Sequence, residues 1–150
     1  LLKFGQARLS AGFIDQLMAA KLTELEANYF DKTRNEYQAR RDVVVSGLKE
    51  IKGVVCQKPE GAFYLIVKLP VKDAEAFAKW LLTDFQDNGE TIMVAPAAGF
   101  YATADLGQDE IRIAYVINQK DLKRSMEILG KALDKYNQKK VISSLRGGTK

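Results

Sequence analysis

The chain has 150 residues, of which 47% are hydrophobic, so it can form one domain with a buried core. It contains no histidine and a single cysteine, Cys56, which excludes the usual neutral-pH base, most zinc sites and an internal disulfide. The net charge of +4 is mild and acids are interspersed with the bases, so nucleic-acid binding is not expected. No apolar run approaches the roughly 20 residues of a membrane-spanning helix, and we expect a cytoplasmic protein.

Helical periodicity dominates the first third of the chain. Apolar residues recur at helical spacing over residues 11–28, which predicts a first helix. A second helix is predicted after Phe30, with Asp31 as its N-cap and Gly53 as a left-handed residue at its end. Its inward face is predicted to carry Tyr37, Val44, Leu48 and Ile51. We expect the two helices to form a brace or an antiparallel hairpin.

From residue 54 onwards the pattern alternates between short strands and helices. Strands are predicted at residues 54–58, 62–69, 91–95 and 111–117, and helices at residues 73–87 and 119–136. Asp73 and Asn118 are the expected N-caps of these helices. The order predicts an α+β two-layer domain, with a mixed or antiparallel sheet of three to four strands and helices on one face. Residues 137–150 are polar and are predicted to form a flexible tail.

Arg112 is the most informative single residue for function. It lies between Ile111 and Ile113 in a strand that is otherwise apolar, and alternation places it on the same face as Ala114 and Val116. An arginine there needs a partner, because burying an unpaired charge is costly. Its planar guanidinium matches a carboxylate in a bidentate manner. The carboxylate could belong to a ligand or to an internal salt bridge, and the residues alone leave both possibilities open.

Two further features are weaker. The segment Pro96-Ala97-Ala98-Gly99-Phe100-Tyr101 follows a predicted strand, and its small residues would let the backbone approach a ligand closely. The alternative is an ordinary loop whose two aromatic residues pack in the core. Cys56 has no histidine partner, so we interpret it as a buried apolar residue and not as a nucleophile. Neither the Gly-x-Gly-x-x-Gly pattern nor a P-loop is present.

Four segments, taken together and in order, resemble the class I pyridoxal-phosphate-dependent aminotransferases of the aspartate aminotransferase type. They are Tyr37 with Arg40-Arg41-Asp42 and Gly47-Leu48, Pro59-Glu60-Gly61-Ala62-Phe63-Tyr64, Met93-Val94-Ala95-Pro96-Ala97-Ala98-Gly99-Phe100 and Ile111-Arg112-Ile113-Ala114-Tyr115. The resemblance covers roughly residues 8–136 and is to the C-terminal, small-domain part of that family. Ala97 stands where the family usually has glycine, a departure from the family pattern in this loop.

The resemblance implies roles for three residues. The family's strand arginine binds the α-carboxylate of the substrate, which assigns that role to Arg112. Phe100 occupies the position of an aromatic residue near the substrate, and Arg8 lies near an arginine that some relatives use for a side-chain carboxylate. The lysine that carries pyridoxal phosphate, in a Ser-x-x-Lys-like context, is expected upstream of Leu1. The resemblance therefore implies no catalytic, cofactor-binding or metal-binding residue in this chain.

The resemblance also implies an organisation and an activity. Residues 1–10 would end a large-domain segment, residues 11–136 would form a helical brace with the small domain, and residues 137–150 would form the tail. The intact homodimeric enzyme would transfer an amino group between an amino acid and a 2-oxo acid, and this fragment alone would be inactive. The alternatives are a non-catalytic α+β domain that binds a small acidic ligand through Arg112, and a basic RNA-binding domain. The substrate, and a related lyase reaction, also remain open.

Overall fold

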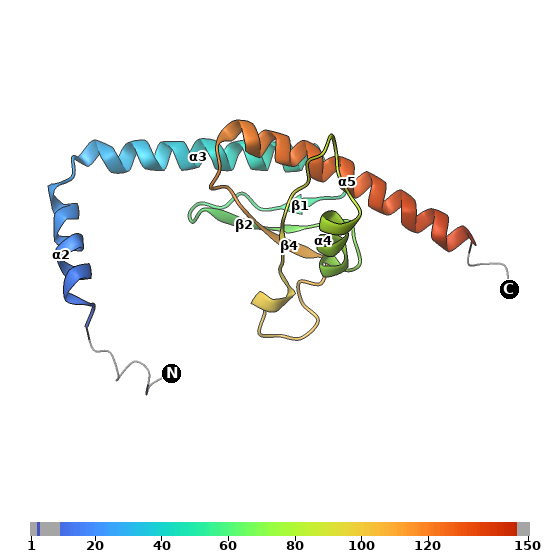
Figure 1. Ribbon diagram of the computed structural model, residues 1–150, viewed down its shortest axis with the longest axis horizontal. Coiled ribbons are helices and arrows are strands. Elements are labelled where there is room, and N and C mark those ends of the chain that lie inside the picture. Colours follow the sequence, from blue (N-terminus) through green and yellow to red (C-terminus); the bar gives the residue numbers. More distant parts are fainter. Residues whose placement is uncertain (1–2, 4–9, 147–150) are drawn as a thin grey trace. The chain divides into compact units, whose positions relative to one another are not determined.

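The structure, a computed structural model, describes Lys3 and residues 10–146 (Figure 1). The chain divides into two compact units, with the boundary between Asn35 and Glu36. Arg8 lies outside the described residues, so its proposed role is not tested. Within the described part of the chain, no helix combines the length and the apolar character needed to cross a membrane.

The first unit is helical. It contains α2 (Phe13–Lys21), the 3-10 helix η1 (Leu22–Glu24) and the start of α3 (Ala27–Lys49). The single helix predicted over residues 11–28 is therefore interrupted. Asp31 is not an N-cap, because α3 begins four residues earlier and the Asp31 carboxylate instead accepts a hydrogen bond from Arg34, one helical turn later, at 2.8 Å. The apolar side chains of α2, including Phe13, Ile14 and Met18, are exposed.

The second unit is built on a four-stranded antiparallel sheet with the order β1-β2-β4-β3. Its strands are β1 (Val55–Cys56), β2 (Tyr64–Lys68), β3 (Ala95–Pro96) and β4 (Glu110–Ala114). Most of the predicted strand at residues 91–95 is irregular, and β3 instead includes Pro96. This proline is tolerated because β3 is an edge strand, where one backbone N–H can be absent from the ladder. The α+β class and the antiparallel sheet predicted from the sequence are confirmed.

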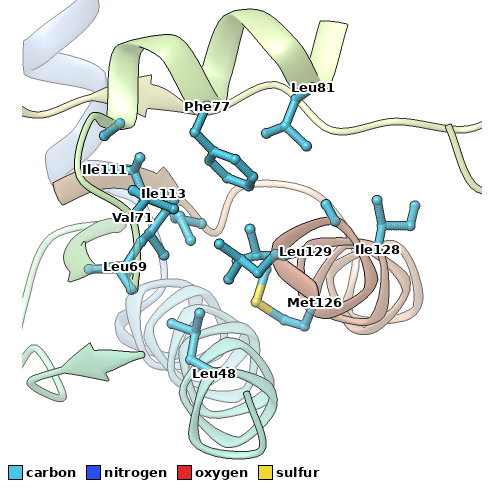
Figure 2. Close-up of a cluster of buried hydrophobic side chains, with 14 of the residues drawn as sticks. Leu48, Leu69, Val71, Phe77, Leu81, Ile111, Ile113, Met126, Ile128 and Leu129 are labelled. Carbon is cyan, nitrogen blue, oxygen red and sulfur yellow. The ribbon is translucent and has the colours of Figure 1, made fainter. Parts of the chain in front are cut away.

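The helices of this unit cover one face of the sheet. That face carries Leu65 and Val67 from β2 and Ile111 and Ile113 from β4, all buried. The second half of α3, α4 (Ala74–Thr83) and α5 (Gln119–Arg146) pack against it in one hydrophobic core (Figure 2). Within this unit, every inward position predicted from periodicity is buried or packed on this core. These positions are Tyr37, Val44, Leu48, Ile51, Phe77, Trp80, Leu81, Phe85, Leu122, Met126, Leu129 and Leu133.

The predicted N-caps of the last two helices are confirmed. The Asp73 carboxylate accepts a hydrogen bond from the Ala76 backbone N–H at 2.9 Å, and the Asn118 side-chain oxygen accepts one from Asp121 at 2.9 Å. The end of α5 differs from the prediction, since the helix continues from Tyr136 to Arg146. The sequence between these residues contains no glycine or proline that would end the helix. The polar composition, on which the prediction of a flexible tail was based, is compatible with a helix.

Candidate functional site

The site lies on the face of the sheet that the helices leave open. Arg112 is in the middle of β4, paired with Ile66 of β2 on one side and with Ala95 of β3 on the other. Because side chains alternate along a strand, burial of Ile111 and Ile113 against the helices directs Arg112 to the opposite face. The arginine is half-buried there. Its place at the centre of a paired strand fixes the base of the side chain.

Two aromatic rings hold the Arg112 guanidinium. Its central carbon lies 4.5 Å from the centre of the Phe100 ring and 5.4 Å from the centre of the Tyr64 ring. Both distances are within the range of a cation–π interaction. Among the described residues, no carboxylate forms an ion pair with this guanidinium, so the internal salt bridge considered from the sequence is not found. The hydrogen-bonding edge of the arginine is therefore available to a ligand.

The loop after β3 carries Phe100 to this position. The Ala97 N–H donates to the Glu110 carbonyl at 2.9 Å, and the Phe100 N–H donates to the Ala97 carbonyl at 2.9 Å within the 3-10 helix η2 (Ala98–Phe100). Ala97 has a φ of −92°, an ordinary value for a residue with a side chain. The alanine that replaces the family's glycine is thus accommodated without backbone strain. Arg112 and Phe100, both singled out from the sequence, are brought together.

The turn before β2 is tied to the end of β4. The Tyr115 hydroxyl donates to the carbonyls of Gly61 and Ala62, at 3.2 and 3.0 Å, and its backbone N–H donates to the Phe63 carbonyl at 2.9 Å. Tyr115 is almost fully buried, and this burial raises the pKa of its hydroxyl. The hydroxyl therefore stays protonated and serves as a structural donor, which holds the strand that carries Tyr64.

Two arginines of α3 donate hydrogen bonds to the segment that precedes β2 and to the segment that follows β4. The Arg40 side chain donates to the Val116 carbonyl at 2.6 Å, and the Arg41 side chain donates to the Pro59 carbonyl at 3.2 Å. Glu36 accepts a hydrogen bond from Arg40 at 2.7 Å, and this bond is the main cause that lowers the pKa of the Glu36 carboxyl. The two arginines appeared in the sequence only as part of a motif. In the structure they fix the ends of the strands that form the site.

Other residues considered for chemistry do not join this site. Cys56 is half-buried in β1, and burial raises the pKa of its thiol, as expected for an unreactive cysteine. Ser46-Gly47-Leu48-Lys49 has the spacing Ser-x-x-Lys, but it lies on α3, in the helical layer on the opposite side of the sheet from Arg112. The described residues contain no group of side chains that could hold a metal ion.

Sequence reasoning missed three residues of the open face. Tyr64 was named in a motif and Tyr101 in the loop after the predicted strand at residues 91–95, neither with a role at the site, and Glu110 was not considered. The Tyr101 hydroxyl donates a hydrogen bond to the carboxylate of Glu110, which lies two residues before Arg112 on the same face of β4. Strand alternation from Arg112 could have identified Glu110. Its pairing with Tyr101 depends on the intervening loop and has no local signal.

The chain is similar to known aminotransferases. The family model described as "Aminotransferase class I and II" matches residues 3–129. An aspartate aminotransferase of Pyrococcus horikoshii is 29% identical over 106 residues, which cover 69% of this chain and 25% of that protein. An aspartate/prephenate aminotransferase of Cereibacter sphaeroides is 34% identical over 111 residues, which cover 61% of this chain and 27% of that protein.

Solved structures support the same fold. The kynurenine aminotransferase of Pyrococcus horikoshii, solved in complex with PMP, superimposes with a TM-score of 0.62 at 21% sequence identity. The match covers 73% of this chain and 26% of that chain. This chain therefore spans about a quarter of the length of the aminotransferases that it matches.

Proposed function

The chain belongs to the class I and II aminotransferase family, and we propose that it supplies the part of an aminotransferase that binds the α-carboxylate of the substrate. The observation that carries this proposal is the Arg112 guanidinium, whose central carbon lies 4.5 Å from the centre of the Phe100 ring and 5.4 Å from that of Tyr64, with no carboxylate partner among the described residues. Arg112 would bind an amino acid and, in the reverse direction, a 2-oxo acid, since both carry a carboxylate at the same position.

The surroundings of Arg112 suit this role. Contact with two rings restricts the guanidinium before the ligand arrives, so less conformational entropy is lost on binding. The two nearby rings also exclude part of the water around the guanidinium, which strengthens its hydrogen bonds. A bidentate pair fixes the direction of the carboxylate as well as its distance. Arg112 would therefore bind and orient the substrate, and would take no part in proton transfer.

The remainder of the reaction is assigned to other parts of the intact enzyme. Pyridoxal phosphate supplies the electron sink for amino-group chemistry when it is bound. We propose that its Schiff-base lysine and its phosphate contacts come from polypeptide outside the described residues. Lys68 shares the face of Arg112 but is paired with Asp109 at 3.0 Å. The intact enzyme would be a cytoplasmic homodimer, and the names of its relatives favour an aspartate-like substrate.

The test is Arg112→Lys in the intact enzyme, with L-aspartate and β-alanine as a matched pair of substrates. β-Alanine is the amine that remains when the α-carboxylate of aspartate is removed. Lysine keeps the charge but loses the bidentate fork. The kcat/KM for L-aspartate should therefore fall about 100-fold, or about 3 kcal/mol, whereas the value for β-alanine should change little.

A structural role for Arg112 makes a different prediction. The substitution would then lower the melting temperature and reduce activity equally on both substrates. An equal loss on L-aspartate and β-alanine, together with a large drop in stability, would refute the assignment of Arg112 to the α-carboxylate. Cofactor absorbance of the variant is the control, because binding of pyridoxal phosphate should not depend on Arg112.

A further inference from the structure

Glu110 is the acid that Arg112 would be expected to bind within the chain. The two residues lie on the same face of β4, separated by Ile111, so their Cα atoms are about 7 Å apart. Long glutamate and arginine side chains readily span that distance. A pair between neighbouring charges on one strand face would occupy the guanidinium edge and exclude a substrate carboxylate. The structure shows no such pair.

Tyr101 binds the Glu110 carboxylate instead. Its hydroxyl donates to the carboxylate oxygen Oε2, and this contact raises the pKa of the Tyr101 hydroxyl, which therefore remains a donor. Lys68, the cross-strand partner of Glu110, is paired with Asp109. Tyr101 is thus the described side chain that fixes the direction of Glu110.

The Tyr101 ring is itself fixed by Gly107. A β-carbon built on Gly107 would lie 2.5 Å and 2.6 Å from two carbons of the ring, and the φ of this glycine is +72°. Both the close approach and the left-handed backbone require a residue without a side chain. The loop between η2 and β4 is therefore shaped to receive the ring and to place its hydroxyl against Glu110.

We propose that Tyr101 is a positioning residue that holds Glu110 away from Arg112 and thereby keeps the arginine free for the substrate carboxylate. This inference rests on the proposed function of Arg112. Removal of the Tyr101 hydroxyl leaves Glu110 without its donor and free to rotate towards the guanidinium. Glu110 then acts as an internal competitor, because the substrate carboxylate cannot bind in molecules where Glu110 occupies Arg112. The apparent Kd for the substrate equals the intrinsic Kd divided by the fraction of molecules in which Arg112 is free.

The test is a double-mutant cycle in the intact enzyme, with Tyr101→Phe, Glu110→Gln and the double variant. If Glu110 occupies Arg112 in nine of ten molecules, Tyr101→Phe should raise the KM for L-aspartate about tenfold with little change in kcat. Glu110→Gln should leave this KM within about twofold of wild type, because glutamine carries no charge to compete for the arginine. The double variant should return to the KM of Glu110→Gln. The KM for β-alanine should change little in all three variants.

The outcomes separate this inference from the proposed function. A raised KM that Glu110→Gln does not rescue would show that Tyr101 acts through the general packing of the loop, and the inference would fail. An unchanged KM in Tyr101→Phe, alongside the expected loss in Arg112→Lys, would also overturn it while leaving the function of Arg112 intact. If neither variant affects L-aspartate selectively, both proposals fail. Melting temperatures of the variants identify any general loss of folding.

Discussion

The guanidinium carbon of Arg112 lies 4.5 Å from the centre of the Phe100 ring. The two residues come from different parts of the unit, Arg112 from the central strand β4 and Phe100 from η2. Phe100 remains 56% exposed, so its ring contributes little to the hydrophobic core. Its contact with the arginine is therefore more important for the site than for folding.

Phe100→Ala should weaken substrate binding without destabilising the protein. A cation–π contact at an exposed position contributes about 0.5–1 kcal/mol, so the KM for L-aspartate should rise roughly two- to fivefold. Phe100→Tyr keeps a ring in place and should behave as wild type. The measurements are steady-state kinetics and thermal melting. A loss of the same size on β-alanine would show that the ring does not act through Arg112.

The sequence predicted those features that depend on local periodicity and on single unusual residues. The stripe Leu122, Met126 and Leu129 is buried as expected, because a helix repeats its inward face every three to four residues. Arg112 was identified because a charge in an apolar strand is costly without a partner. Both inferences needed only neighbouring residues and elementary energetics.

Features that depend on tertiary placement were not predictable. The hydrogen bond between Tyr101 and Glu110 joins residues nine positions apart across a loop in which Gly107 packs closely against the Tyr101 ring. Asp31 was predicted to be an N-cap, but α3 begins at Ala27 and Asp31 lies inside the helix. An aspartate is compatible with a helix interior when its carboxylate binds a basic side chain one turn away, as it binds Arg34 here. The helix propensity of the neighbouring residues could not decide whether Asp31 lies at the N-cap or inside the helix.

Gly47→Ala should destabilise the second unit. Gly47 lies where α3 approaches α5, and an added β-carbon would stand 2.6 Å from Cβ and 2.7 Å from Cγ of Met126. The first of these atoms is close to the backbone and cannot move without shifting the helix. We expect a loss of about 1–3 kcal/mol in the free energy of unfolding, measured by urea denaturation.

Gly130→Ala is the matched control for this substitution. Gly130 is also a helix-interior glycine, on α5, but its added β-carbon would lie 3.5 Å from Cγ1 of Ile51, an ordinary contact. Replacing glycine by alanine in a helix stabilises by roughly 0.5–1 kcal/mol, so this variant should be at least as stable as wild type. Equal stability of the two variants would contradict the close approach of Gly47 and Met126.

Asp87 links the segment after α4 to α5, and its contribution to stability should depend on pH. Its carboxylate accepts from Lys131 at 2.7 Å and from Arg124 at 2.9 Å. The hydrogen bond from Lys131 is the largest cause that lowers the pKa of Asp87 below 3.8. A lowered pKa in the folded state means that the stabilisation is present at neutral pH and is lost as the pH falls through that pKa.

Asp87→Asn should therefore lower the melting temperature by a few degrees at pH 7, and the difference from wild type should shrink below about pH 4. High salt should reduce the difference only in part, because the Asp87 side chain is 19% exposed. Asp134→Asn serves as the control, since Asp134 is exposed on α5 and forms no ion pair with the described residues. A deficit that stayed constant from pH 7 to pH 3 would exclude the carboxylate as its cause.

The 150-residue chain by itself should neither transaminate nor form a specific lysine adduct with pyridoxal phosphate. It spans about a quarter of the length of its relatives, and Lys68, which lies on the same face of the sheet as Arg112, is paired with Asp109. The measurement is absorbance after mixing with the cofactor, followed by borohydride reduction and peptide mapping. We expect scattered modification of exposed lysines at less than one cofactor per chain. A single stoichiometric adduct at one lysine, accompanied by turnover of L-aspartate, would show that this chain carries the complete catalytic apparatus and that Arg112 is not merely one part of a larger site.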